Sequence, residues 1–339
     1  MTIDQDNDTI THIPVIDLTG MKTNLEDTAD QVLAAAREVG FFFVRIPPEQ
    51  KEYLHMFDTA KDFFAQPAEE KLKYSVNLET NFGYSALRQE GVDVTRSQRD
   101  FKESYNMGRL VNGIPQHELA PSFSEKMDIV RQFQDRCNSI AVDIMECMAI
   151  ALKIPEEQGG RSYFSRQYLK DTTPSDVMRT LHYPALEASS TEENAQDEVR
   201  IGRHSDYGLI TLLWQNKVGG LQIQSNREPT DPAKMTWLDV PVRDDCLVVN
   251  LGDCLQYWTN GLLRSTKHRV IFKPGMEQQE RYSIAYFVQG GDMALDPVPS
   301  TLIPAAPPSF TSMAQEEPVH FKTSNDYLRH RLAMTYTAY

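Results

Sequence analysis

Four runs decide the fold of this chain: YGLITLLW at residues 207–214, CLVVNL at 246–251, STKHRVIF at 265–272 and RYSIAYFV at 281–288. They are rich in aromatic, β-branched and Leu residues, which favour strands over helices. Each run is six or eight residues long, which is a usual length for a strand. The stretch from residue 200 to residue 288 is therefore expected to be mainly β-structure.

A possible metal site accompanies these runs. His204 and Asp206 precede the first run directly, and side chains two apart on extended backbone point the same way. His268 lies in the third run. Two imidazoles and one carboxylate on a β scaffold are the ligand set that holds non-haem Fe(II) with open positions, whereas structural zinc prefers four ligands, commonly with Cys. Because the chain has eight histidines, a His-x-Asp pattern alone is a weak signal.

The fourth run adds a possible anion site. Arg281, Ser283, Ala285 and Phe287 alternate along it, so their side chains share one face of the predicted strand. A guanidinium offers a planar fork to two carboxylate oxygens, and a neighbouring hydroxyl adds a third donor. This face is therefore a candidate carboxylate receptor.

Helical patterns flank the predicted sheet. Apolar residues recur at helical spacing over 24–39, 49–65 and 124–152, with Ser124 as an expected N-cap, and the tail 323–339 is also predicted to be helical and to pack back onto the body. Further strands are expected at 13–18, 41–46, 221–224 and 235–240. We expect one compact unit, with a helix and strand region at 1–120 packed on a core at 121–339.

Turn residues separate the short strands. A turn is expected at 227–234, and Gly252-Asp253 with Asn260-Gly261 indicates a further hairpin. Many short strands with such turns are typical of a double-stranded β-helix, the jelly-roll architecture, here with helices bracing its outside. Residues 80–109 are predicted to form loops and short strands over the barrel mouth, and 186–198 to be a solvated acidic insertion.

Charge and composition exclude several partners. The chain has 34 Lys and Arg against 48 Asp and Glu, a net charge of −14 that repels nucleic acid and anionic membranes. No apolar run approaches the roughly 20 residues of a membrane span, and the polar start is unlike a signal peptide. The four Cys lack paired metal-site spacing and suit a reducing compartment. We expect a cytoplasmic protein; its oligomeric state stays open.

Short motifs along nearly the whole chain resemble one family, the Fe(II)/2-oxoglutarate-dependent dioxygenases of the isopenicillin N synthase-like group. In chain order they are Ile13-Pro-Val-Ile-Asp17, Gly40-Phe-Phe-Phe-Val44, Gly83-Tyr84, His182-Tyr-Pro184, His204-Ser-Asp206, Gly219-Gly-Leu-Gln-Ile223, Val249-Asn-Leu-Gly-Asp253, His268-Arg-Val270 and Arg281-Tyr-Ser283. Three stretches look most like fungal members, including thymine hydroxylases and polyketide-tailoring oxygenases: 102–105, 179–184 and 281–287.

The resemblance implies a cofactor, two cosubstrates and their residues. His204, Asp206 and His268 would be catalytic metal ligands for Fe(II), while 2-oxoglutarate and O2 would react at the metal. Arg281 and Ser283 would bind the far carboxylate of 2-oxoglutarate. The remaining residues are given by their matches to family positions: Tyr183 supports the cosubstrate, and Arg179, Tyr207 and Phe287 line the substrate pocket.

Two departures from the family bear on substrate choice. Arg203 stands where smaller or uncharged residues are usual, which suggests substrate binding, and Phe82 replaces a polar residue of thymine hydroxylases. We therefore expect oxidation of a small cyclic, aromatic or acidic fungal metabolite, with release of succinate and CO2. The alternatives are a pyrimidine hydroxylase, a family oxidase that does not use 2-oxoglutarate, and a non-catalytic ligand-binding relative. His182 is expected to be a core or supporting residue rather than a ligand.

Overall fold

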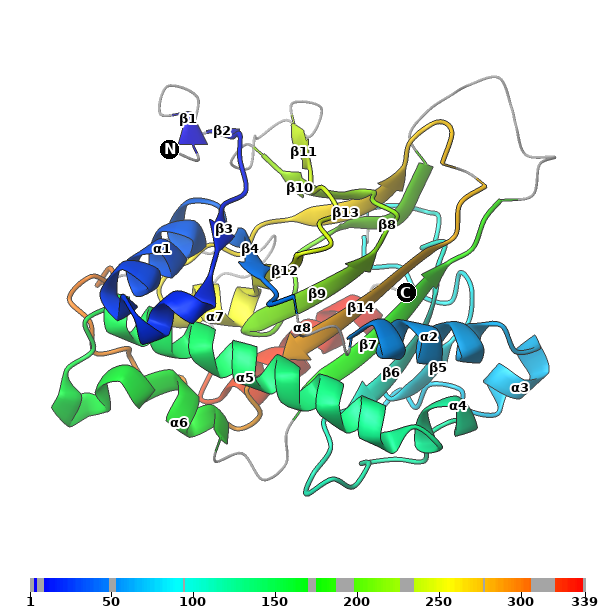
Figure 1. Ribbon diagram of the computed structural model, residues 1–339, viewed down its shortest axis with the longest axis horizontal. Coiled ribbons are helices and arrows are strands. Elements are labelled where there is room, and N and C mark those ends of the chain that lie inside the picture. The colour runs from blue at the N-terminus through cyan, green and yellow to red at the C-terminus, as the bar shows by residue number, and fades with distance from the viewer. Residues whose placement is uncertain are drawn as a thin grey trace.

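Two β-sheets pack against each other at the centre of the molecule. The computed structural model describes residues 3–4, 9–48, 53–93, 95–169, 175–186, 198–225, 235–276, 278–305 and 321–337. Over these residues one sheet has eight strands and the other four, and a separate ribbon pairs β1 (Ile3–Asp4) with β2 (Thr9–Ile10). The two large sheets form the predicted double-stranded β-helix, and helices brace its outside (Figure 1).

The strand order places residues from distant parts of the chain side by side. The larger sheet runs in the order β3 (Val15–Ile16), β4 (Phe41–Arg45), β12 (Cys246–Leu251), β9 (Ile210–Asn216), β14 (Arg281–Val288), β7 (Val177–Tyr183), β6 (Glu103–Gly108) and β5 (Gly83–Ser85). The smaller sheet runs in the order β11 (Trp237–Asp239), β10 (Leu221–Gln224), β13 (His268–Phe272) and β8 (Glu198–His204). Strands from 1–120 thus form both ends of the larger sheet, and β4 also pairs directly with β12.

Helices cover the outer face of the larger sheet (Figure 1). The α-helices are α1 (Leu25–Glu38), α2 (Tyr53–Phe64), α3 (Ala68–Leu72), α4 (Pro121–Ser124), α5 (Met127–Ala151), α6 (Tyr163–Leu169), α7 (Asp253–Trp258) and α8 (Ser324–Thr337). Short 3-10 turns lie at Leu18–Lys22, Glu156–Gln158 and Gly160–Ser162. The long helix α5 packs against α1, α2 and the sheet.

Strand alternation divides the apolar residues into two cores. Phe42 and Val44 of β4 point outward into a core shared with the helices, whereas Phe41 and Phe43 point into the space between the sheets. The strand β14 follows the same rule, because Ile284 and Tyr286 join the helical core while Ala285 faces the other sheet. The inner space is therefore lined by one face of each sheet.

Two predicted boundaries are wrong. Ser124 ends the short helix α4 instead of capping the long one, and α5 begins at Met127 after Lys126 as its N-cap. The predicted hairpin between Gly252 and Gly261 is the helix α7. Asn260 and Gly261 both have positive φ, as a hairpin turn would require, but here they end a helix, and Gly261 N–H donates to Gln256 O at 2.8 Å.

The predicted strand 207–214 starts later than expected. β9 begins at Ile210, so Asp206 and Tyr207 lie in the connection between β8 and β9. The expected strands and loops of 80–109 correspond to β5, β6 and the segment between them. The predicted turn at 227–234 and nearly all of the acidic insertion lie outside the described residues. Among the helices that are described, none combines the length and apolar character needed to cross a membrane.

Candidate metal and cosubstrate site

A single cavity between the two sheets contains most of the predicted site residues. Its volume is about 550 Å³, including its open mouth. The lining residues are Phe41, Arg179, Leu181, Tyr183, His204, Asp206, Thr211, Leu213, Leu221, Asn250, His268, Val270, Arg281, Ser283, Ala285 and Phe287. The wall is mainly apolar with a few convergent polar groups, as is typical of small-molecule sites.

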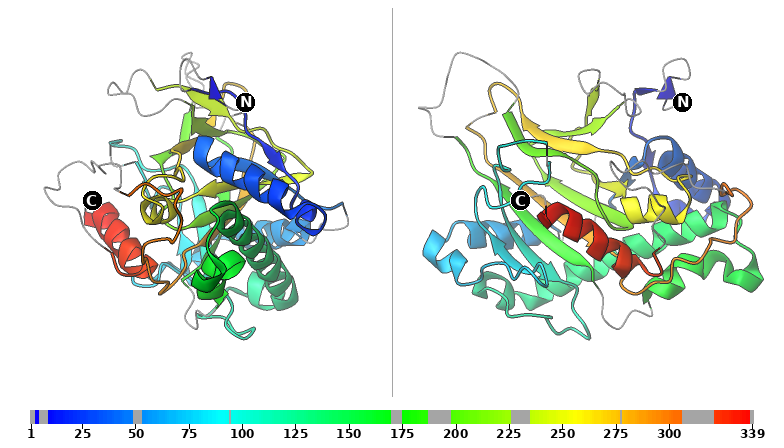
Figure 2. Two further views of the ribbon diagram at one scale, coloured as in Figure 1. Left: turned by 90° about the vertical axis from the view of Figure 1, so that its left-hand side faces the viewer. Right: turned by 180° about the vertical axis from the view of Figure 1, so that it is seen from behind.

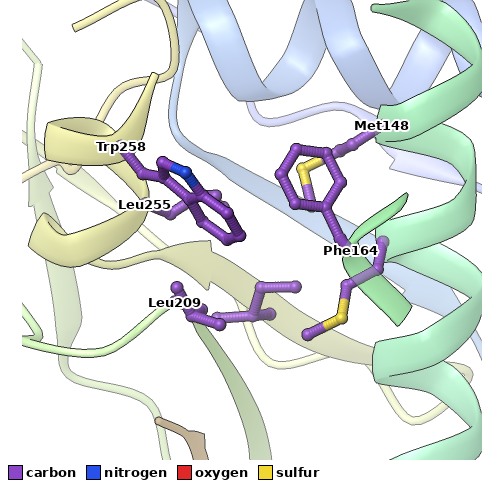
Figure 3. Close-up of a pocket in the computed structure, with 7 residues that line it drawn as sticks. Met148, Phe164, Leu209, Leu255 and Trp258 are labelled. Carbon is purple, nitrogen blue, oxygen red and sulfur yellow. The ribbon is translucent and has the colours of Figure 1, made fainter. Parts of the chain in front are cut away.

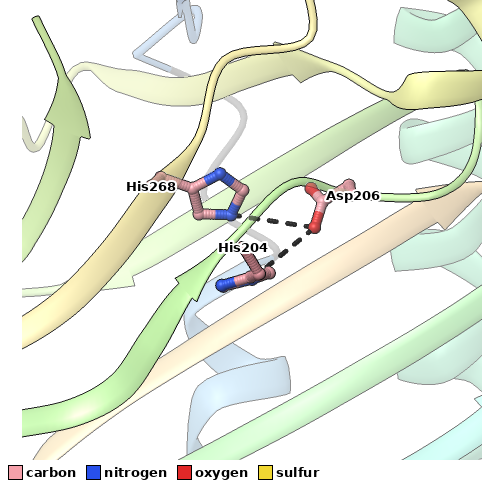
Figure 4. A group of neighbouring side chains, drawn as sticks. All are labelled: His204, Asp206 and His268. Carbon is pink, nitrogen blue, oxygen red and sulfur yellow. Dashed lines mark ion pairs between the residues drawn. The ribbon is translucent and has the colours of Figure 1, made fainter. Parts of the chain in front are cut away.

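Two strands and one connection bring the three predicted metal ligands together (Figure 4). His204 ends β8 and lies directly opposite His268 of β13 in the antiparallel pairing. Asp206 Oδ1 lies 3.8 Å from His204 Nε2 and 3.7 Å from His268 Nε2. One ligand atom from each residue lies within 4.8 Å of the others, which is close enough for all three to bind one ion.

Hydrogen bonds to backbone carbonyls orient both imidazoles. His204 Nδ1 lies 2.9 Å from Gly202 O, and His268 Nδ1 lies 3.2 Å from Thr266 O. Since a carbonyl only accepts, each Nδ1 carries the proton and each Nε2 presents a lone pair to the cavity. Burial lowers the pKa of His204, and burial together with its neighbour His204 lowers that of His268 to about 4. Both rings are therefore neutral near pH 7, as metal ligation requires.

The carboxylate is oriented in the same way. Asp206 Oδ2 accepts from Thr211 Oγ1 at 2.6 Å and from Asn250 Nδ2 at 2.7 Å, which leaves Oδ1 facing the histidines. Burial alone would raise the pKa of Asp206, but the two imidazoles and these hydrogen bonds outweigh it, so the pKa is lowered. An ionised carboxylate beside two neutral imidazole nitrogens is a donor set that fits Fe(II).

A buried guanidinium faces the same cavity. Arg281 is 1% exposed and donates to Ser283 Oγ at 3.0 Å and to Gln215 Oε1 at 3.2 Å, with its Cζ 4.7 Å from the Tyr183 ring centre. Its Nε has no hydrogen-bond partner, and no carboxylate of the described residues pairs with it. Burying an uncompensated cation is costly, so this group is suited to receive an anion. Burial lowers the pKa of Arg281 accordingly.

The predicted substrate contacts Arg179 and Phe287 also line this cavity, close to each other. The Arg179 Cζ lies 5.7 Å from the Phe287 ring centre. Arg179 is not a free charge, however, because its Nη1 lies 3.4 Å from Glu90 Oε2 and its Nε donates to Asn106 Oδ1 at 2.7 Å. Glu90 also binds the buried Lys102. The positive charge of Arg179 is therefore largely offset by Glu90.

Two predicted substrate residues do not lie on the cavity wall. Arg203 follows Gly202 on β8, and its Nη1 points to Met235 Sδ at 3.4 Å. Tyr207 stacks under Arg331 of α8, with 4.6 Å from the guanidinium carbon to the ring centre. Arg203 alternates with His204 along β8, so its side chain points away from the cavity. Tyr207 lies in the connection between β8 and β9, where its ring contacts Arg331. This geometry gives no support to a substrate contact by either residue.

His182 has the supporting position expected of it. It lies on β7 beside Tyr183 but points to the opposite side, where its Nδ1 lies 2.7 Å from Glu103 Oε1 and its ring stacks on Tyr282. Sequence reasoning assigned no role in the site to Thr211, Asn250, Glu90, Lys102 or Asn106. Two of them gave a signal: Asn250 is the one polar residue inside the apolar run CLVVNL, and Lys102 begins the stretch 102–105 that resembles fungal members.

A second, apolar pocket lies among side chains of α5, α6, α7 and the start of β9 (Figure 3). Its lining residues are Met145, Met148, Phe164, Leu209, Ile210, Leu255 and Trp258. The one polar atom in this set, Trp258 Nε1, donates away to Asp296 O at 2.7 Å. The pocket offers no ligand for a metal or a carboxylate, and its side chains serve to pack the start of β9.

Two family models match the chain. The 2OG-Fe(II) oxygenase superfamily model matches residues 174–290, which include the three clustered ligands and Arg281. The model described as the N-terminal region of non-haem dioxygenases in morphine synthesis matches residues 13–128. The two matches cover the strands of both halves of the larger sheet.

Relatives extend this match over most of the chain. A UPF0676 protein of Schizosaccharomyces pombe is 35% identical over 81% of this chain and 81% of its own length. The proline hydroxylase buaE of Petromyces alliaceus is 32% identical over 77% of this chain and 81% of its own. Full-length thymine hydroxylase of Neurospora crassa, solved with α-ketoglutarate and thymine, is 29% identical with a TM-score of 0.75, covering 99% of each chain. The chain belongs to the 2OG-Fe(II) oxygenase superfamily and is an oxidoreductase that uses Fe(II), 2-oxoglutarate and O2.

Proposed function

We propose that this protein oxidises a small cyclic metabolite at Fe(II) held by His204, Asp206 and His268, with 2-oxoglutarate as cosubstrate. One observation carries the proposal most directly. A fully buried guanidinium, with which no carboxylate of the described residues pairs, faces the same cavity as a cluster of two neutral imidazoles and one carboxylate. A cation site and an anion site in one cavity suit a ligand that chelates the metal at one end and carries a carboxylate at the other.

The cosubstrate contacts follow from the position of Arg281. Its Nε is free to donate, Ser283 Oγ lies beside it, and the Tyr183 ring closes one side of the group. Because Gln215 and Ser283 hold the fork in place, little side-chain entropy remains to be lost when a carboxylate binds. We assign the far carboxylate of 2-oxoglutarate to Arg281 and Ser283, with Tyr183 as support.

The bound metal and cosubstrate supply the chemistry, in which 2-oxoglutarate is converted to succinate and CO2 while O2 oxidises the substrate. The protein's residues orient and shield the reacting groups. Asn250 and Thr211 keep Asp206 ionised and aimed at the histidines. Apolar side chains such as Leu181 and Val270 exclude water from the cavity wall.

The substrate is proposed to be a flat ring with a polarised oxygen. Phe287 offers an apolar surface, and Arg179 offers a donor whose orientation is fixed by Asn106 and Glu90. Since Glu90 offsets the charge of Arg179, a phenol, enol or cyclic amide suits the group as well as a carboxylate does. The cosubstrate takes part of the cavity, which favours a small molecule. The thymine bound by the Neurospora crassa relative has these properties and is the second candidate class.

The test measures succinate and the oxidised product in the same reaction. The iron-loaded enzyme is incubated with 2-oxoglutarate and a panel of pyrimidines, phenolic acids, fungal polyketides and neutral terpenes, and succinate is measured together with the oxidised product. We expect equal amounts of both with a polar-oxygen ring substrate. Product formation without succinate would identify an oxidase that does not use 2-oxoglutarate, and a best turnover with a neutral terpene would contradict the proposed substrate class.

A further inference from the structure

The connection from residue 205 to residue 209 sets the position of Asp206. Unlike His204 and His268, Asp206 is not fixed by a strand ladder, because β8 ends at residue 204 and β9 begins at residue 210. Backbone hydrogen bonds from α7 replace the ladder. Asp253 N–H donates to Asp206 O at 2.7 Å, and Cys254 N–H donates to Tyr207 O at 3.1 Å. The start of α7 therefore holds the backbone of this connection.

Side chains hold the connection 205–209 by apolar packing on one side and by a hydrogen bond on the other. On the inner side, Leu209 packs among Leu255, Trp258 and Phe164 (Figure 3). On the other side, Ser205 Oγ donates to Asp253 Oδ2 at 2.9 Å. Asp253 therefore makes two hydrogen bonds to the connection: its backbone N–H donates to Asp206 O, and its carboxylate accepts from Ser205 Oγ.

The C-terminal helix α8 also contacts this group of residues. Arg331 of α8 donates its Nη1 to Asp253 Oδ2, the same oxygen that Ser205 binds, and its guanidinium lies over the Tyr207 ring. Figure 2 shows α8 running across the back of the molecule beside α7, and the two helices are in contact. Arg331 therefore contacts one residue that flanks Asp206, Tyr207, and the hydrogen-bond partner of the other, Ser205.

The contact between Arg331 and Asp253 is an ion pair as well as a packing contact. The Asp253 side chain is only 9% exposed, whereas Arg331 is 30% exposed and reaches it from the solvent side. Without Arg331, Asp253 would keep the hydrogen bond from Ser205 but lose the counter-charge of this pair. A buried carboxylate that loses its partner tends to move toward water, and Ser205 would move with it.

We propose that α8 is a positioning element for the metal site, in which Arg331 acts through Asp253 and Tyr207 to keep Asp206 aimed at the two histidines. The inference rests on the proposed role of Asp206 as an iron ligand. Arg331 is a positioning residue, because it touches neither the cavity nor a ligand atom. Residues that orient metal ligands from outside typically contribute ten- to a hundredfold in metal affinity.

The test measures Fe(II) affinity directly. The dissociation constant for Fe(II) is determined anaerobically, by competition with a chromogenic chelator, for the full-length protein and for Arg331→Ala and Arg331→Lys. We expect about a tenfold weaker affinity in Arg331→Ala and partial recovery in Arg331→Lys, which keeps the charge. The KM for 2-oxoglutarate should stay unchanged in both, because Arg281 lies elsewhere in the cavity.

Two control variants separate positioning from stability. Ser324→Ala removes the hydrogen bond from Ser324 Oγ to Gly291 O (2.7 Å) that fixes the start of α8, and Arg329→Ala removes an exposed Arg from the same helix. Both controls should keep the wild-type Fe(II) affinity when measured well below their melting temperatures. Wild-type affinity in Arg331→Ala, or an equal loss in Ser324→Ala, overturns the inference. Failure of the wild-type protein to bind one Fe(II) would instead overturn the proposed function.

Discussion

Each of the three proposed iron ligands presents one atom to the cavity because its other polar atom is already bonded. The histidines use Nδ1 for backbone carbonyls, and Asp206 uses Oδ2 for Thr211 and Asn250. The lone pairs that converge on the cavity are therefore selected by the fold before any metal binds. This preorganisation explains why removing one ligand should affect metal binding far more than stability.

The first prediction concerns the three ligands. His204→Ala, Asp206→Ala and His268→Ala should each abolish turnover, because two remaining ligands cannot hold Fe(II) in the required geometry. Circular dichroism should show a retained fold, since the sheets and both apolar cores are untouched. Metal analysis after anaerobic reconstitution should give one iron per chain in the wild type and far less in the variants. Full activity in Asp206→Ala would refute the assignment.

The second prediction concerns the cosubstrate. Arg281→Leu should raise the KM for 2-oxoglutarate by about tenfold to several hundredfold, because charge-assisted hydrogen bonds contribute about 1.5–3 kcal/mol each. Ser283→Ala should have a smaller effect in the same direction. Arg243→Leu is the control, since this Arg pairs with Asp245 outside the cavity. An unchanged KM in Arg281→Leu would show that the cosubstrate carboxylate binds elsewhere.

For single residues, the sequence predicted best which face of a strand a side chain lies on, provided that the strand is regular. The alternation in RYSIAYFV was enough to place Arg281, Ser283 and Phe287 on one face, and all three line the cavity. It could not reveal that Glu90 pairs with Arg179, because those residues are 89 positions apart and Glu90 lies in a connection without a period. The match of Tyr207 to a family substrate position has no support here, because its ring contacts Arg331 and does not line the cavity.

At the scale of elements, one local signal can have two structural meanings. Asn260 and Gly261 favour positive φ, which suits both a hairpin turn and the end of a helix. The buried residues Cys254, Leu255 and Trp258 resolve the ambiguity, because their spacing places one face of α7 against the body. The start of α7 is also what holds the connection around Asp206, so this misread element is part of the site.

A second segment is fastened to the strand that carries His204. The rim segment, residues 89–93 and 95–102, follows β5 and lies along β8. Asp100 Oδ1 accepts from Gly202 N at 3.0 Å, Asp93 Oδ2 accepts from Arg203 N at 3.2 Å, and Phe101 N donates to Arg200 O at 2.9 Å. A Cβ placed on Gly202 would lie 2.3 Å from Asp93 Cβ. The close approach of the rim segment therefore depends on a residue without a side chain.

The third prediction follows from this close approach. Gly202→Ala should push the rim segment away from β8 and destabilise the protein by about 1–3 kcal/mol, the usual cost of overpacking. Hydrogen exchange should become faster in the rim segment than in the rest of the chain. Gly219→Ala is the matched control, because its new Cβ would meet only Val242 Cγ2 at an ordinary 3.8 Å. Equal exchange rates in the two variants would contradict the proposed fastening.

At the scale of the whole molecule, the N-terminal region contributes strands to the sheet that bears the site. β4 lies between β3 and β12, and β5 and β6 extend the opposite edge. Phe41 of β4 lines the cavity and makes an edge contact with the His268 ring at 5.4 Å. We propose that 1–120 and 121–339 fold as one unit. The motifs predicted the strands themselves, but the pairing of segments about 200 residues apart depends on the packing of the whole sheet and not on local sequence.

Buried charges link the N-terminal region to the core and make stability depend on pH. Glu103 of β6 accepts from Lys71 at 2.7 Å, from His182 at 2.7 Å and from the Tyr84 hydroxyl. Burial alone would raise the pKa of Glu103, but these three hydrogen bonds outweigh it and lower the pKa below its ordinary 4.5. The unfolded chain therefore takes up this proton more readily than the folded one as the pH falls.

The last prediction is the acid sensitivity that follows. Because the folded pKa is lowered, the contribution of Glu103 to stability is fully present above about pH 4.5 and is lost as the pH falls from there toward the folded pKa. Glu103→Gln cannot titrate, so it should be less stable than the wild type at pH 7, by about 3 kcal/mol or more for a broken buried pair, and the difference should shrink by pH 3. Urea unfolding of the metal-free proteins at pH 7, 4 and 3 measures this. Glu70→Gln, which breaks only the exposed pair with Lys73, should show almost no difference at any of these pH values. A difference for Glu103→Gln that is the same at pH 7 and pH 3 would mean that the protonation of Glu103 is not linked to folding.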